Sequence, residues 1–284
     1  MSTPREYQTP GIIIRKAKLG EADRILTLYT PELGKIEAVA KGVRRPKSKM
    51  AGHLELLTYS QVTLARGRSL DIIIGSQTIE SFLPLKNDLW LMSYGLYIIE
   101  LTNQFTAANI SDEALFQLLL NTLRNLCQTE NREMLLRYFE LHLLQESGYR
   151  PQLRECVACH QLLQPVVNSF SSSNGGVLCP SCGARQPFSH PISINAVKVL
   201  RFIQDNTLEA VLRLRINQTL SLELEGVTRG YLKYLLEREV KSANWLDDLR
   251  EQTKVMMPSK KETPKDIIES SVIANEAKQS RGEE

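Results

Sequence analysis

The spacing of apolar positions divides the chain into a strand-like first third and a helical remainder. In the first 83 residues, short runs rich in β-branched and apolar residues alternate with turn compositions such as Pro31-Glu-Leu-Gly. The runs that predict strands are residues 11–17, 24–30, 35–41, 54–65 and 70–79. The last two flank Arg66-Gly-Arg-Ser and carry alternating apolar residues, which predicts a hairpin. Five strands without a long intervening helix favour a small antiparallel barrel.

From Pro84 onward, apolar residues recur at three- and four-residue spacings, which predicts helices. The expected helices are residues 89–105, 112–127, 132–146, 193–204 and roughly 218–241. Ser111 and Asp112 provide an N-terminal signal for the second helix, and Gly148 ends the third. Gly226 and Gly230 weaken the last helix by about 1 kcal/mol each relative to alanine, unless a close packing partner needs them.

These elements predict an α+β protein of several domains, with an N-terminal barrel followed by a helical domain. Among five-stranded barrels, the OB-fold is the commonest nucleic-acid binder, although an SH3-like barrel would give a similar pattern. The expected divisions are an OB-fold barrel at 1–83, a helical domain at 84–150 and 191–249, a cysteine module at 151–190 inserted into it, and a disordered tail at 250–284. The tail is expected because its few apolar residues cannot offset the entropy of ordering.

Four of the five cysteines form two C-x-x-C pairs, Cys156/Cys159 and Cys179/Cys182. Each pair can reach one metal ion from a tight turn, and two such turns complete a tetrahedral shell of four sulfurs, which suits zinc. A full shell leaves no open position for water or substrate, so we expect one structural Zn²⁺ per chain rather than a catalytic ion. Reduced thiols without metal, a redox dithiol, and His160 as a substitute ligand are the alternatives.

A second signal is Lys41-Gly-Val-Arg-Arg-Pro-Lys-Ser-Lys49, which holds five cations and no acid. The net charge of the chain is +3, but residues 1–83 hold 13 Lys and Arg against 8 Asp and Glu. Cations grouped on one loop can neutralise DNA phosphates and release condensed counterions. The predicted DNA-binding residues are Lys41, Arg44, Arg45, Lys47 and Lys49, with Arg15, Lys16, Arg66 and Arg68 as an extension of the groove. The alternative is a merely solvated loop between strands.

The remaining sequence carries no recognisable catalytic motif, so we expect a protein that is not an enzyme. Gly34-Lys35 resembles the end of a phosphate loop, but position 29 is tyrosine and Ile36 replaces the required Ser or Thr. No run approaches eighteen consecutive apolar residues, and Met1 to Pro10 has no apolar segment for a signal peptide. We therefore expect a soluble, cytoplasmic and nucleoid-associated protein without membrane contact.

Several of these segments, taken in order, resemble the RecO family of bacterial DNA repair and recombination mediators. The resemblance extends from about Gly11 to Leu249 and rests on the order of Gly20-Glu-Ala-Asp-Arg, Leu33-Gly-Lys, the basic segment 41–48, Arg137-Tyr-Phe-Glu-Leu-His, the two cysteine pairs and Lys241-Ser. His160 stands where that family often has glycine, which is a departure in the first cysteine turn.

The resemblance implies an N-terminal OB-fold, a helical domain and an inserted zinc module. It also implies a protein that binds single- and double-stranded DNA, anneals complementary strands, and acts with RecR. Together they would help load RecA onto strands coated by single-stranded-DNA-binding protein, whose C-terminal tail is a further expected partner. Two rival hypotheses remain: a zinc-ribbon adaptor whose barrel binds protein, and a zinc-dependent nuclease or hydrolase with an open metal site.

Overall fold

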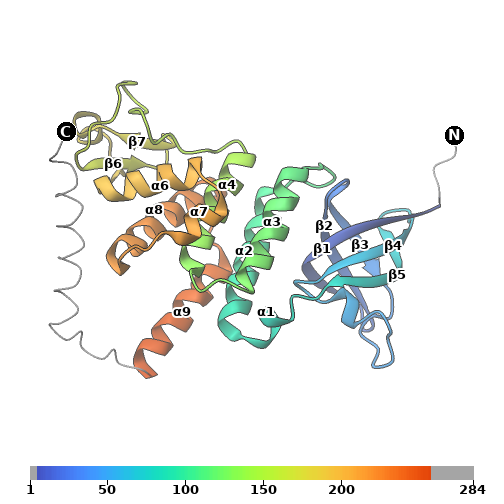
Figure 1. Ribbon diagram of the computed structural model, residues 1–284. Coiled ribbons are helices and arrows are strands. Elements are labelled where there is room, and N and C mark those ends of the chain that lie inside the picture. Colours follow the sequence, from blue (N-terminus) through green and yellow to red (C-terminus); the bar gives the residue numbers. More distant parts are fainter. Residues whose placement is uncertain (1–4, 257–284) are drawn as a thin grey trace, which may run out of the picture. The chain divides into compact units, whose positions relative to one another are not determined.

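The N-terminal part of the computed structural model is a closed five-stranded barrel, in which the strands follow the order β1-β2-β3-β5-β4 (Figure 1). The structure describes residues 5–256, with side chains to residue 252. The strands are β1 (Glu6–Leu19), β2 (Asp23–Thr30), β3 (Gly34–Ala40), β4 (Tyr59–Ala65) and β5 (Asp71–Glu80). β3 and β5 close the barrel as a parallel pair, and the other pairs are antiparallel. This is the closed barrel that the strand pattern predicted, with the OB-type order.

β1 is long enough to belong to both walls of the barrel. Its first half pairs with β4 and its second half with β2, and Ile12 stands opposite both Tyr59 and Tyr29. The register shifts between Ile13 and Arg15, and such an irregularity bends a strand. A single bent strand can therefore close the small barrel.

The two faces of the barrel strands are buried for different reasons. Leu26, Leu28 and Leu64 are 0% exposed and fill the barrel interior, as expected for alternating inward positions. Ile12 and Tyr29 belong instead to the core shared with the helices. The ring of Tyr29 lies 6.2 Å from that of Phe116, so this outer face of the barrel is covered rather than open to a ligand.

The segment between β3 and β4 departs from the predicted strand 54–65. Residues before Tyr59 form a short 3-10 turn, η1 (Gly52–Leu54), and Leu57 follows with φ 55° and no exposed surface. Leu54 packs in the barrel core, and Leu57 packs in the core shared with the helices. These apolar residues anchor a loop, but in the sequence they look like the apolar positions of a strand, and the strand was therefore predicted too long.

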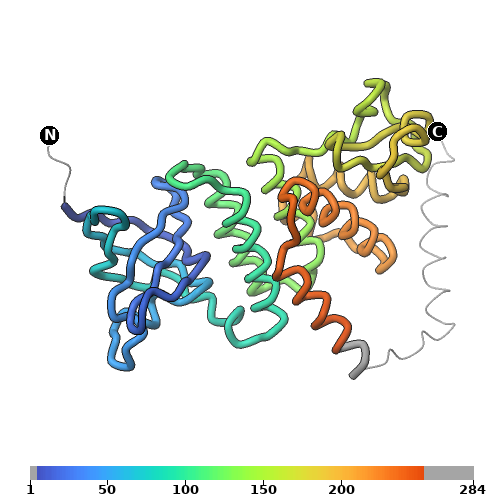
Figure 2. Tube along the Cα trace, turned by 180° about the vertical axis from the view of Figure 1, so that it is seen from behind, coloured from blue at the N-terminus to red at the C-terminus, as the bar shows by residue number. Residues whose placement is uncertain are grey.

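Helices make up most of the chain after the barrel, and they pack on one another, as Figures 1 and 2 show. They are α1 (Leu83–Asn87), α2 (Leu89–Phe105), α3 (Glu113–Leu126), α4 (Arg132–Glu146), α6 (Ile194–Asp205), α7 (Leu208–Arg213) and α8 (Gln218–Leu236). Asp112 caps α3 by accepting a 2.9 Å hydrogen bond from the Leu115 backbone, and Gly148 follows α4 with φ 80°. Both terminal signals in the sequence therefore act as predicted.

The predicted helix 218–241 corresponds to α8, which ends before residue 241. α8 ends at Leu236, because Glu237 adopts the left-handed conformation with φ 52°. A second helix, α9 (Lys241–Met256), begins where the Glu100 carboxylate accepts hydrogen bonds from the backbone of Lys241 and Ser242. A Cβ built on Gly226 or Gly230 meets no atom within 4 Å, so no close packing partner requires these glycines.

The cysteine module is inserted between α4 and α6, as the sequence predicted. It contains β6 (Asn168–Ser171), β7 (Gly176–Leu178), α5 (Pro180–Gly183) and β8 (His190–Ile192), and its three strands are ordered β7-β6-β8. Phe170 is 4% exposed and lies 5.6 Å, between ring centroids, from Tyr231 of α8. The module is therefore tied to the helical core by its central strand.

The tail was expected to begin at residue 250, but α9 continues to Met256. Leu249, Arg250, Glu251, Gln252 and Lys254 are all good helix formers, which explains why the helix does not stop where the apolar pattern fades. The rest of the predicted disordered tail lies outside the described residues. Within residues 5–256, none of the helices combines the length and the apolar character needed to cross a bilayer.

Candidate metal centre and nucleic-acid interface

Two tight turns bring the four cysteines of the module together. In the first turn, His160 donates its backbone N–H to the Cys156 carbonyl at 2.8 Å, and its φ of 59° lies in the left-handed region. In the second turn, Cys179 starts α5 and accepts a 2.8 Å hydrogen bond from the Gly183 backbone. The two turns meet where the Cys179 backbone N–H donates to Cys156 Sγ at 3.3 Å.

The four sulfur atoms have the spacing of a tetrahedral thiolate site. All four lie within 4.8 Å of one another, and Cys159 Sγ lies 3.9 Å from Cys179 Sγ. Metal–sulfur bonds of about 2.3 Å in a tetrahedron place the sulfurs about 3.8 Å apart. The donor set therefore fits a metal ion that prefers four sulfur ligands, and the four cysteines could bind such an ion.

Glycines allow the backbones around this cluster to approach closely. A Cβ built on Gly176 would lie 2.4 Å from the Gln152 carbonyl oxygen, which accepts a 2.9 Å hydrogen bond from Val177. A Cβ on Gly183 would lie 2.6 Å from Ser169 Oγ. Gly176 and Gly183 thus permit the close packing that holds both turns in place.

The hydrogen bonds within the cluster divide the thiols into two kinds. A hydrogen bond from Ser181 lowers the pKa of Cys179 to about 6, and a hydrogen bond with Cys179 raises the pKa of Cys182 to about 12. Because a bound metal requires thiolates, metal binding releases the protons of those cysteines that are still thiols, and it therefore depends on pH.

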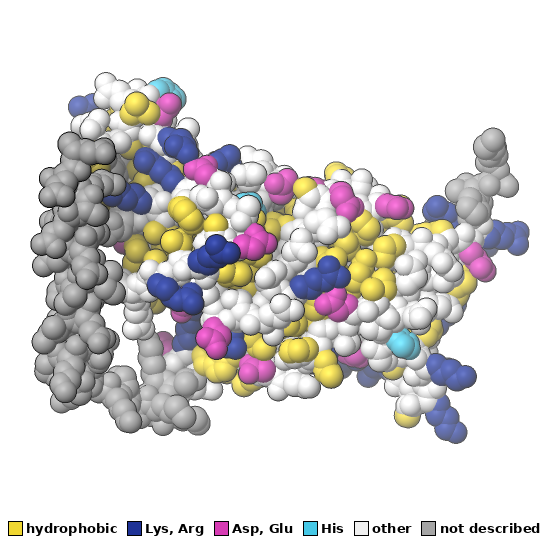
Figure 3. Space-filling model, in the orientation of Figure 1, with side chains coloured by type: hydrophobic (Ala, Val, Ile, Leu, Met, Phe, Trp, Pro, Cys, Tyr) yellow, Lys and Arg dark blue, Asp and Glu magenta, His cyan; other side chains and the backbone are white. Residues whose placement is uncertain are grey.

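The basic loop 41–49, which connects β3 to η1, is anchored at its start. The Gly42 backbone donates to Asp23 Oδ1 at 2.7 Å, the Arg44 backbone donates to the Ala22 carbonyl at 3.0 Å, and Val43 is buried in the barrel core. The side chains of the five cations are exposed, and within the described residues none of them forms an ion pair: Lys41, Arg44, Arg45, Lys47 and Lys49. Figure 3 shows Lys and Arg side chains projecting from the barrel at its lower right.

The other four predicted DNA-binding residues do not extend this loop into one groove. Arg15 and Arg66 line a separate cleft of about 1080 Å³, where Arg66 lies over the Tyr7 ring at 4.9 Å. Arg68 is exposed in the β4–β5 turn. Lys16 forms an ion pair with Glu55, and only 9% of its side chain is exposed. Lys16 is therefore paired at the junction of barrel and loop, and it lines a cleft of about 500 Å³ next to Arg15.

Two cations that the sequence pattern did not single out lie beside the loop, as the strand register shows. Lys18 stands opposite Arg24, and Arg24 stands opposite Ala40, the last residue of β3. Pairing the first two predicted strands across their turn could have found both residues. In the separate cleft, Lys35 and Arg238 join Arg15 and Arg66.

Lys35 is held by the end of a helix rather than by an anion. Its ammonium donates to the carbonyl oxygens of Asn103 at 2.7 Å and Thr106 at 2.5 Å, which satisfies the C-terminal end of α2. Burial lowers the pKa of Lys35. Lys35 therefore caps the end of α2, and the Gly34-Lys35 pair is part of this helix contact rather than of a phosphate loop.

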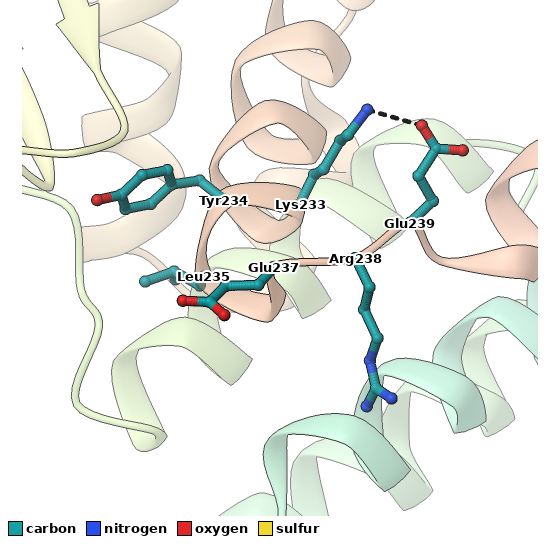
Figure 4. Close-up of a pocket in the computed structure, with 6 residues that line it drawn as sticks. All are labelled: Lys233, Tyr234, Leu235, Glu237, Arg238 and Glu239. Atoms are coloured by element: carbon teal, nitrogen blue, oxygen red, sulfur yellow. Dashed lines mark hydrogen bonds and ion pairs between the residues drawn. The ribbon is translucent and has the colours of Figure 1, made fainter.

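A further cleft of about 750 Å³ lies where α8 turns toward α9 (Figure 4). Lys233 and Glu239 form an ion pair of 2.7 Å across the turn, and Arg238 points away from it toward a neighbouring helix. Arg238 donates to Gln104 Oε1 at 3.2 Å. The charged groups of this turn are thus used to fix the helix connection.

Comparison with known proteins covers both the barrel and the helical part. Residues 1–82 match the family described as "Recombination protein O N terminal", and residues 86–244 match "Recombination protein O C terminal". The chain belongs to the RecO family. The resemblance stated from the order of the sequence motifs is confirmed.

Several RecO proteins are similar to this chain along nearly their whole length. A DNA repair protein RecO of Dehalococcoides mccartyi (strain CBDB1) is 49% identical over 250 residues, covering 88% of this chain and 98% of that protein. The RecO protein of Roseiflexus sp. (strain RS-1) is 40% identical over 255 residues, covering 90% of each chain. That of Alkaliphilus metalliredigens (strain QYMF) is 35% identical over 234 residues, covering 81% and 94%. The family function is DNA repair.

Proposed function

We propose that this RecO protein binds single- and double-stranded DNA through the loop 41–49 and anneals complementary strands. With RecR, it would assist loading of RecA onto strands coated by single-stranded-DNA-binding protein, through that protein's C-terminal tail. One observation carries the DNA-binding step: five exposed cations without carboxylate partners lie on a loop that is anchored to the barrel. These anchors hold the start of the loop on the barrel, so the charges of Lys41, Arg44 and Arg45 stay close together.

The proposed interface consists of the five loop cations, with Lys18 and Arg24 beside them and Arg15, Arg66 and Arg68 as secondary contacts. Such cations neutralise phosphates, and the resulting affinity depends steeply on salt and little on sequence. Lys16 is left out, because its charge is already paired with Glu55. The same contacts would serve both strands of a duplex, since they address the backbone.

We further propose that the four cysteines hold one structural Zn²⁺. The sulfur spacing and the turn hydrogen bonds support a closed shell, which would stabilise the module and leave no position for a substrate. A role in catalysis is therefore not part of the proposal. The chemistry supplied by the ion would be structural, by fixing the two turns.

The proposal is tested by fluorescence anisotropy of a single-stranded oligonucleotide across a salt series. If the loop contacts about five phosphates, the log–log slope of affinity against salt should approach about −3.5, at about −0.7 per contact. Replacing all five loop cations with alanine should remove most of that slope without unfolding the protein. A Lys16→Met variant is the matched control and should bind as the wild type does.

A salt-flat affinity, or a loop variant that binds as tightly as the wild type, would contradict this interface. The rival is a zinc-ribbon adaptor that binds protein through exposed apolar residues. One observation favours it: Phe188 and Leu162 of the cysteine module are 89% and 71% exposed. A double variant, Phe188→Ser with Leu162→Ser, separates the two functions. If it still binds DNA with a steep dependence on salt, DNA binding does not use these apolar residues.

A further inference from the structure

A second group of cations lies where the chain leaves α4, enters the cysteine module and packs along α6. The group consists of Arg150, Arg154, Lys198 and Arg201, here called the α6 patch. Figure 3 shows Lys and Arg side chains gathered over α6 and the adjoining module, at the upper left. These residues are separated from the loop 41–49 by about a hundred residues of sequence and lie on a different element of the fold.

The α6 patch is a built surface rather than a set of loose side chains. Arg201 Nε donates to the Leu153 carbonyl at 2.7 Å, and Gln204 Nε2 donates to the Pro151 carbonyl at 3.0 Å. Two side chains of α6 thus hold the segment 150–154 by its backbone. Leu153 and Pro151 are buried, so the segment is fixed from below while its arginines face solvent.

The positive charges of the patch exceed the carboxylates that contact them. Arg154 lies 2.5 Å and Arg150 3.3 Å from the two oxygens of one carboxylate, that of Asp205. Arg201 directs its Nε to a carbonyl and forms no ion pair within residues 5–252. Burial and the positive charge of Arg154 lower the pKa of Arg201, and the carboxylate of Asp205 opposes this shift. Lys198, one turn before Arg201 on α6, is exposed.

Because the arginines of the patch outnumber the carboxylates that contact them, the patch suits a partner that carries several negative charges. Arginine binds phosphate through two parallel hydrogen bonds, and neutralising phosphates with fixed cations releases counterions. A backbone contact needs no base recognition, so cations alone can make it. The chemistry therefore favours a nucleic-acid backbone over a small anion, which would use one or two of the cations.

The helical core lies between this patch and the barrel. β1 of the barrel packs on α2, α2 packs on α4, and α4 packs on α6. Figures 1 and 2 both place the barrel and α6 on different sides of α2 and α3. A short strand bound at the loop 41–49 would thus leave the α6 patch available to a second strand.

We infer that the α6 patch is a second phosphate-backbone site, which holds a second DNA strand while the barrel loop holds the first. The inference rests on the proposed function, since it assumes that the loop 41–49 binds one strand. It assigns the annealing activity a physical basis: two strands held on one protein meet at a high effective concentration.

The test uses two single-stranded oligonucleotides of about 16 nucleotides that are not complementary, so that pairing cannot hold them together. One strand carries a donor dye and the other an acceptor dye, and the full-length protein is titrated into both at equal concentration. Energy transfer reports capture of two strands. The wild-type protein should give transfer, and the annealing rate of complementary strands should be measured on the same samples.

The test variant replaces Arg150, Arg154 and Lys198 with glutamine and leaves Arg201, which holds the backbone. It should bind the first strand as the wild type does, lose energy transfer, and anneal more slowly. Its second-strand salt slope should fall by about 2, at about 0.7 per lost contact. The matched control replaces the exposed cations Arg213, Arg215 and Lys241 with glutamine and should retain energy transfer.

Unchanged energy transfer in the test variant, or an equal loss in the control, would overturn the inference. A third outcome is that the loop 41–49 variant loses first-strand binding while the patch variant still captures two strands. That outcome would support the proposed function and reject the second site. Should the triple variant fold poorly, Lys198→Gln alone keeps the test open, because the side chain of Lys198 forms no hydrogen bond or ion pair within the described residues. Its loss should still reduce energy transfer.

Discussion

Tyr97 of α2 donates a 2.7 Å hydrogen bond to the Glu140 carboxylate of α4, and both side chains are 0% exposed. Arg137 donates to the same carboxylate oxygen at 2.6 Å. The buried charge of Glu140 is thus compensated from two helices. Burial, together with the neighbouring carboxylate, raises the pKa of Tyr97, so the phenol stays protonated. The Arg137-Tyr-Phe-Glu motif that carried the family resemblance is therefore a structural motif of the helical core.

Replacing Glu140 with alanine should destabilise the protein by about 3–5 kcal/mol, because it leaves the charge of Arg137 buried without a partner. Tyr97→Phe removes one hydrogen bond to a charged group and should cost about 1.5–3 kcal/mol. Urea unfolding of both variants measures the difference. A Glu140→Ala variant as stable as the Tyr97→Phe variant would contradict the pairing.

Cys156→Ser should abolish binding of the metal ion and destabilise the cysteine module, since metal binding to such modules is coupled to folding. Metal content measured by mass spectrometry, with melting followed in parallel, checks the prediction. Cys127→Ser is the control, because Cys127 lies in the helical part and away from the four sulfurs. Full metal content in the Cys156→Ser protein would remove that residue from the ligand set.

His160→Gly should stabilise the cysteine module slightly. A left-handed conformation costs a side-chain-bearing residue about 1–2 kcal/mol, whereas glycine loses about 0.5–1 kcal/mol more on ordering. The net gain is expected to be about 0.5 kcal/mol, visible as slower release of the metal to a chelator. Faster release from the glycine variant would mean that the histidine side chain itself supports the turn.

Acidification below pH 6.5 should reduce stability partly through His142. Burial lowers the pKa of His142 in the folded protein, so the unfolded chain binds a proton more readily between that lowered pKa and 6.5. Stability contributed by neutral His142 is therefore present above pH 6.5 and is lost as the pH falls through this window. His142→Phe keeps the ring stacked on Tyr138, at 3.8 Å between centroids in the native pair, and removes the titration. Melting temperatures at pH 7.5 and 5.5 should converge more in this variant than in the wild type.

Gly34→Ala should destabilise the junction between β3 and the chain after α2. A Cβ at this position would lie 1.9 Å from the Ile110 carbonyl oxygen, and φ is 64°. Backbone strain and overpacking together should cost about 2 kcal/mol or more. Gly20→Ala is a matched control, because Gly20 has φ 59° but no atom within 4 Å, so it should show the strain alone. Equal losses in both variants would mean that the contact with Ile110 can relax.

The sequence alone determined the parts of this protein whose physical cause is local. Alternating apolar residues predicted the barrel strands, three- and four-residue spacing predicted α2 and α4 with the bounds observed, and two C-x-x-C pairs predicted a four-sulfur cluster. Each of these features depends on residues close in sequence, since side-chain direction follows backbone period and a tight turn brings two cysteines to one point.

The tertiary structure decided what depends on distant partners. The ion pair with Glu55 set Lys16 apart from the other predicted cations, and the register of β1, β2 and β3 placed Lys18 and Arg24 beside the loop. The left-handed Glu237 ended the expected helix 218–241 at Leu236. The grouping of Arg150 and Arg154 around Asp205 has no sequence period, because the segment after α4 and the helix α6 meet only when the core packs. Charge acts through space, so only the folded chain determines which charges are neighbours.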